Sequence, residues 1–130
     1  MNESFLSKFK AFLPAIFWSL FILLVSWNAG GLNLPPNLFD LVGTDKLAHA
    51  TVYFLLFWTI LYGLRKTGAD TPRALILSAL WCVFYGVLME VLQYLYFPGR
   101  YFEFFDIVAN IIGVFSSFAI FYFRKKQKAL

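Results

Sequence analysis

Residues 74–97 of this chain read ALILSALWCVFYGVLMEVLQYLYF, a run of 24 residues with a single charged side chain, Glu90. An α-helix rises about 1.5 Å per residue, so a helix of this length spans the roughly 30 Å hydrocarbon core of a bilayer. The run is continuously apolar and lacks the inside–outside alternation of a barrel strand. It therefore predicts a transmembrane helix.

Three further apolar runs of similar character cover residues of about 11–27, 47–64 and 107–123. Turn-forming residues separate the four runs, in segments 28–36, 67–72 and 98–100. Basic residues precede the first run, as in a signal peptide, but residues 26–28 make a poor cleavage site, so we interpret the run as a retained span. The sequence predicts an all-α membrane protein, with residues 1–130 as one domain of four transmembrane helices.

The composition agrees with this fold class. The chain is 61% hydrophobic and only 14% charged, whereas soluble domains carry about 25% charged residues. The net charge of +4 comes from basic residues beside apolar runs, a distribution that does not favour nucleic acid as a partner. The single cysteine, Cys82, excludes an internal disulfide and a thiolate metal cluster.

The basic residues predict how the chain crosses the membrane. In a four-span topology nine of the eleven fall on one side: Lys8, Lys10, Arg65, Lys66, Arg73, Arg124, Lys125, Lys126 and Lys128. The positive-inside rule then places both termini in the cytoplasm. The outer side holds only Lys46 and Arg100, among the acidic residues Asp40, Asp45, Glu90, Glu103 and Asp106.

Polar residues recur in pairs at the expected outer ends of three spans. Helical spacing places the members of each pair on one face: Asp45 with His49, Glu90 with Gln93, and Asp106 with Asn110. Small residues continue two of these faces, so we expect spans three and four to form a tight hairpin, with span two closing an outward pocket. The predicted ligand-binding residues are Asp45, Lys46, His49, Glu90, Gln93, Arg100, Asp106 and Asn110.

Each of these residues also has a structural interpretation. Asp45 and Asp106 stand where a carboxylate caps a helix start. Glu90 is equally compatible with a structural ion pair to a nearby cation. A lone His49 is more often a satisfied interior side chain, and Asn110 a hydrogen-bonding contact between helices. Convergence of eight polar groups at one level is what favours function over these alternatives.

The same residues form motifs whose order and spacing resemble a known family. The motifs are Asp45-Lys46-x-x-His49 with Tyr53, Glu90-x-x-Gln93, Pro98-Gly99-Arg100, and Asp106-x-x-Ala109-Asn110-x-x-Gly113. Over residues 45–113 the chain resembles the VanZ-like family of small bacterial membrane proteins. The resemblance implies a multi-pass protein of the bacterial cytoplasmic membrane, and founding members are associated with low-level resistance to the glycopeptide teicoplanin. Ala50 and the bulky segment 101–103 depart from the family pattern.

Three functions remain open on these residues. The first is a binding module whose outward pocket holds the headgroup of a membrane lipid or cell-envelope precursor, with Arg100 contacting an anion. The second is an enzyme that uses His49, Glu90 and Asp106 as catalytic groups, either by acid–base chemistry or around a divalent metal. The third is a structural or partner-binding protein. We expect no resident metal or cofactor, and the sequence does not predict an oligomeric state.

Overall fold

The computed structural model describes residues 3–28, 44–98 and 101–127 of the chain. These residues form four α-helices: α1 (Glu3–Asn28), α2 (Thr44–Lys66), α3 (Pro72–Tyr96) and α4 (Phe104–Gln127). Each helix is long and apolar enough to cross a membrane. The predicted fold class, an all-α integral membrane protein with four helices, is confirmed.

The helices are longer than the apolar runs that predicted them. α1 begins eight residues before the predicted span and continues through Pro14, while α4 runs four residues past its span into the basic tail. Lys, Arg and Glu are good helix formers, so the backbone stays helical where the hydropathy falls. α3 begins at Pro72, a residue that is well tolerated in the first turn of a helix. The Thr71 hydroxyl caps this end by accepting a hydrogen bond from the Ala74 amide at 3.2 Å.

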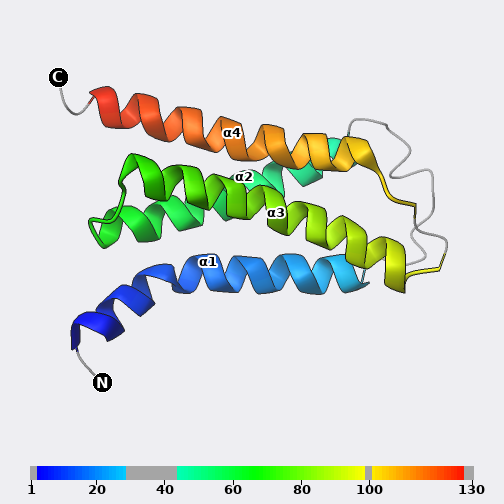
Figure 1. The fold of residues 1–130 in the computed structure, drawn as a ribbon, viewed down its shortest axis with the longest axis horizontal. Helices are drawn as coiled ribbons and strands as arrows, with labels where there is room; N and C mark the ends of the chain where they lie inside the picture. Colours follow the sequence, from blue (N-terminus) through cyan, green and yellow to red (C-terminus); the bar gives the residue numbers. More distant parts are fainter. Residues whose placement is uncertain (1–2, 29–43, 99–100, 128–130) are drawn as a thin grey trace.

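The four helices lie side by side along one axis (Figure 1). The start of α1 and the end of α4 lie at the same end of the bundle, together with the connection between α2 and α3. α2 contacts all three other helices, and its closest partner is α4. α3 and α4 are in contact, as a hairpin of spans three and four requires. The expectation that α3 is the tight partner of α4 is wrong, because α4 contacts α2 more extensively.

Gly113 explains the close approach of α4 to α2. A Cβ built on Gly113 would lie 2.9 Å from the carbonyl carbon of Ala50, closer still to its oxygen, and 3.0 Å from the backbone nitrogen of Phe54. Only a residue without a side chain lets the two backbones meet in this way. The small-residue face of α4 thus packs against α2. The spacing of residues within α4 does not predict which helix packs there.

The burial pattern is that of a protein surrounded by lipid. Large apolar side chains such as Phe17, Phe105 and Phe115 are exposed on the outside, while Glu90 and Asp106 are buried inside. An exposed apolar surface of this extent marks contact with a membrane or with partners. α1 joins the bundle through three hydrogen bonds to backbone oxygens: Trp18 donates to Val52 at 2.9 Å, Tyr85 to Ser19 at 2.7 Å, and Gln93 to Ser26 at 3.3 Å.

Candidate functional site

The ammonium group of Lys46 is the centre of an ionic contact between α2 and α4. Its Nζ lies 3.3 Å from Asp45 Oδ2 and 2.7 Å from Glu103 Oε2, and it donates a close hydrogen bond to Asp106 Oδ1. Asp106 comes from the first turn of α4, and Glu103 immediately precedes that helix. The contact therefore ties the start of α2 to the start of α4.

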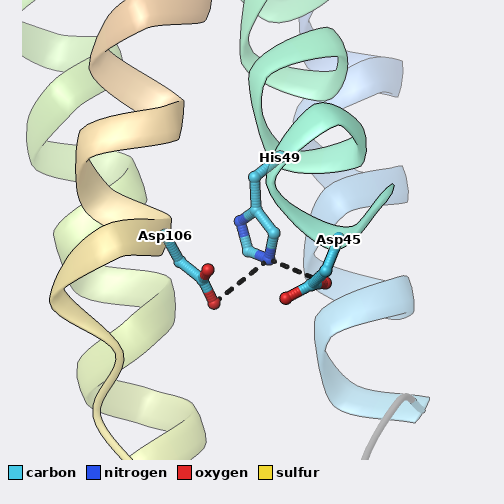
Figure 2. Close-up of side chains that lie close together, drawn as sticks. All are labelled: Asp45, His49 and Asp106. Atoms are coloured by element: carbon cyan, nitrogen blue, oxygen red, sulfur yellow. Dashed lines mark ion pairs between the residues drawn. The ribbon is translucent and has the colours of Figure 1, made fainter. Parts of the chain in front are cut away.

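His49, one turn further along α2, points between two of these carboxylates (Figure 2). Its Nε2 lies 3.5 Å from Asp106 Oδ2 and 3.9 Å from Asp45 Oδ1. On the other side of the ring, Nδ1 lies 3.1 Å from Asn110 Oδ1. We call these six residues the polar cluster: Asp45, Lys46, His49, Glu103, Asp106 and Asn110.

The contact with Asn110 relates the roles of the two ring nitrogens. When Nδ1 of His49 carries the proton, it donates to the Asn110 amide oxygen, which can only accept a hydrogen bond. In the neutral ring Nε2 then faces the carboxylates of Asp45 and Asp106 as a third acceptor. Three converging acceptors are stable only when a donor or a cation stands among them. That role falls to a second ring proton, a hydroxyl, an amine or a metal ion.

The polar cluster is graded in depth and negative in charge. The side chain of Asp106 is 5% exposed, whereas those of Asp45 and Glu103 are 41% and 53% exposed. Three carboxylates stand against one ammonium, which leaves a formal charge of −2 when the ring of His49 is neutral. The cluster thus offers hydrogen-bond acceptors that range from exposed to buried.

A second polar layer lies one turn deeper. A Cβ on Gly86 of α3 would lie 2.9 Å from Asn110 Nδ2 and 3.2 Å from Tyr53 Cε1, so residues of α2, α3 and α4 meet there. Among the described residues, three buried polar atoms in the interior have no hydrogen-bond partner: Tyr53 Oη, Asn110 Nδ2 and Ser117 Oγ. Buried polar groups are normally satisfied, so these three atoms are exceptions within the described interior.

The structure brings together five of the eight predicted site residues, Asp45, Lys46, His49, Asp106 and Asn110. Glu90 is buried on α3 and is not part of the polar cluster. Gln93 faces α1, where its amide donates to the Ser26 carbonyl at 3.3 Å. Arg100 lies outside the described residues. Glu103 was not among the predicted site residues, although its place three residues before Asp106 was a usable signal.

The polar cluster also contains a potential set of metal ligands. One donor atom each from Asp45, His49 and Asp106 lies within 4.8 Å of the others. A metal-bound histidine commonly donates its second ring N–H to a polar neighbour, and Asn110 supplies that contact. These groups fit a divalent cation of the kind that binds nitrogen and oxygen. Lys46 competes with it, because its ammonium already occupies Asp45 and Asp106.

Comparison with known proteins leaves the site to be judged on its own residues. The chain matches no protein-family model, no curated protein and no solved structure. What the helices and their hydropathy establish is an integral membrane protein with four helices that are each able to cross a bilayer.

Proposed function

We propose that this integral membrane protein binds the headgroup of a membrane lipid or of a lipid-linked cell-envelope precursor at the polar cluster. The observation that carries the proposal is the convergence of three polar atoms, Nε2 of His49 and one carboxylate oxygen each of Asp45 and Asp106. Sugar hydroxyls or an amine would supply the donors that these atoms need. The excess of negative charge favours such a headgroup over a bare phosphate at this position.

The energetic cost of the polar cluster supports a role beyond stability. Replacing a buried ion pair by apolar residues of similar volume is often neutral or stabilising, so burial of Asp106 is not required to hold α2 and α4 together. Ionisable groups within membrane-spanning segments are by default candidates for function. Lys46, held by three carboxylates, then positions those groups for the ligand. An anionic part of the headgroup is assigned to Arg100, as the sequence predicts.

The proposed membrane orientation and protein family rest on the sequence. The basic residues favour an orientation with the polar cluster on the outer side of the membrane. The motifs of residues 45–113 favour a VanZ-like protein of the bacterial cytoplasmic membrane, and with it a place in the cell envelope and a link to teicoplanin resistance. The assignment rests on these motifs alone, so its test is a measurement of lipid binding.

The experiment measures lipid binding to the purified full-length protein by native mass spectrometry, after incubation with lipids extracted from bacterial cytoplasmic membranes. We expect Asp106→Asn to weaken retention of the bound species about tenfold or more, since hydrogen bonds to a charged group contribute about 1.5–3 kcal/mol. Asp70→Asn is the matched control, because Asp70 pairs with Lys125 at 2.8 Å at the other end of the bundle. Equal retention by both variants would contradict the proposal.

Arg100→Ala addresses the anionic part of the headgroup in the same assay. We expect this variant to lose anionic lipids selectively and to keep neutral glycolipids, because a guanidinium recognises phosphate or carboxylate through paired hydrogen bonds. Unchanged affinity for every anionic lipid would remove Arg100 from the site and leave the acceptor groups as its basis.

A second candidate is a metal-dependent membrane enzyme acting on a lipid-linked envelope substrate. The observation that favours it is that one donor atom each of Asp45, His49 and Asp106 lies within 4.8 Å of the others. When bound there, a divalent cation would activate water or polarise a phosphoryl or carbonyl oxygen. Elemental analysis of the purified protein and of His49→Ala tests this. A stoichiometric metal that the variant loses supports the enzyme, and no metal with no turnover of lipid-linked substrates excludes it.

A further inference from the structure

A cavity of about 380 Å³ lies between α2 and α4 at the end of the bundle opposite the polar cluster. Cavities of this size accommodate a small ligand or a lipid headgroup. One face of each helix lines it, with residues at helical spacing: Trp58, Tyr62, Arg65, Phe121, Arg124 and Gln127. Arg65 and Arg124 belong to the last turns of α2 and α4, so the cavity lies at the basic end of the bundle.

The two arginines give this cavity a positive charge that the surrounding protein leaves available. Within the described part of the chain, neither guanidinium has a carboxylate at ion-pair distance. The nearby carboxylate of Asp70 is taken by Lys125, whose Nζ lies 2.8 Å from it. The guanidinium carbon of Arg124 lies 5.6 Å from the centre of the Trp58 ring, a cation–π contact that orients its donors.

The other lining groups suit the part of a lipid where the headgroup meets the acyl chains. The Tyr62 hydroxyl and the Gln127 amide are donors at the rim, while the buried ring of Phe121 forms an apolar wall. Trp, Tyr and Arg are the residues that gather at the boundary between hydrocarbon and water. Guanidinium groups match the oxygens of a phosphate in pairs.

We propose that this cavity binds the phosphate group of an anionic phospholipid from the leaflet at the basic end of the bundle. Basic pockets between transmembrane helices on the cytoplasmic side are a recurrent way of binding acidic headgroups. The site is separate from the polar cluster and differs from it in sign, since one presents carboxylates and the other guanidinium groups. Each can therefore be removed without touching the other.

A simpler role for the arginines has to be separated from this one. Basic side chains in the last turn of a helix also offset the partial negative charge of the terminal carbonyls. Lys126 gives the control, because it stands in the same last turn of α4 and does not line the cavity. A lipid site predicts different consequences for Arg124→Gln and Lys126→Gln, whereas a helix-end effect predicts the same.

The experiment measures the affinity of the full-length protein in neutral detergent for phosphatidylglycerol, by native mass spectrometry over a lipid titration. Phosphatidylcholine with the same acyl chains and inorganic phosphate are the comparison ligands. We expect Arg65→Gln and Arg124→Gln each to weaken phosphatidylglycerol binding about fivefold, and the double variant about 25-fold. Lys126→Gln should leave the affinity within twofold of the unaltered protein. Phosphatidylcholine should bind more weakly, and inorganic phosphate should compete only at far higher concentration.

Three results would overturn the assignment. One is equal loss of affinity in Arg124→Gln and Lys126→Gln, which reduces the arginines to helix-end charges. The second is equal binding of phosphatidylglycerol and phosphatidylcholine, and the third is competition by inorganic phosphate at the concentration of the lipid. Should a glutamine variant fail to fold, Arg65→Lys and Arg124→Lys keep the charge and remove the planar fork. They are expected to lose at least twofold in affinity, and full retention contradicts the proposal.

Discussion

A single methyl group added at Gly113 is expected to force α2 and α4 apart. In Gly113→Ala the new Cβ would lie 2.9 Å from the Ala50 carbonyl carbon, against an ordinary carbon–carbon contact of about 3.5 Å. The helices must therefore separate by at least about 0.6 Å, because the atoms that it meets are backbone and cannot rotate away. Overpacking of this kind costs about 1–3 kcal/mol or more, and the higher helix propensity of alanine returns about 1 kcal/mol.

We take the upper end of this cost, about 3 kcal/mol, because the contacted atoms are backbone, so the expected net loss of unfolding free energy is about 2 kcal/mol, or roughly thirtyfold in the unfolding equilibrium constant. Titration of the protein in mild detergent micelles with sodium dodecyl sulfate, followed by circular dichroism, measures it. Ser116→Thr adds a methyl group to the exposed side of the same helix and should change the stability by less than about 0.5 kcal/mol. A Gly113→Ala protein as stable as the unaltered one would refute the close packing of α2 on α4.

Three further predictions use the same unfolding assay. Lys46→Met leaves the buried carboxylate of Asp106 without its ammonium and should cost about 3 kcal/mol, most of which the additional change Asp106→Asn should recover. Tyr85→Phe removes a hydrogen bond to α1 and should cost about 0.6 kcal/mol. The hydrogen bond from Lys125 lowers the pKa of Asp70, so this pair stabilises the fold fully above about pH 4 and loses its effect as the pH falls through the lowered pKa. Asp70→Asn should therefore cost up to about 1 kcal/mol at pH 7 and nothing at pH 2.

The four spans could be predicted because their signal is one of length and hydropathy, which a bilayer imposes directly on the sequence. The sequence did not predict which helices pack against each other. Gly113 shows that one face of α4 is small, but a small face accepts any partner helix. The structure assigns it to α2, where the backbone of Ala50 fills the space.

The polar cluster was predictable in part for the same reason. Helical spacing correctly joined Asp45 to His49 and Asp106 to Asn110, and the packing of α2 on α4 brings the two pairs into contact. Lys46, one of the predicted ligand-binding residues, is neutralised by three carboxylates and is poorly placed to meet an anion. Such pairing depends on which side chains face each other across helices, and spacing within one helix carries no information on that.

A headgroup bound at the polar cluster would supply donors to His49 between Asp45 and Asp106, and the single histidine of the chain permits a direct test. Nitrogen-15 NMR of the histidine ring in the full-length protein resolves its two nitrogens while lipids from bacterial cytoplasmic membranes are added. We predict a proton on Nδ1 throughout and a saturable change of the Nε2 signal as the headgroup binds. A lipid whose binding is weakened by Asp106→Asn but leaves the Nε2 signal unchanged would contradict binding at His49.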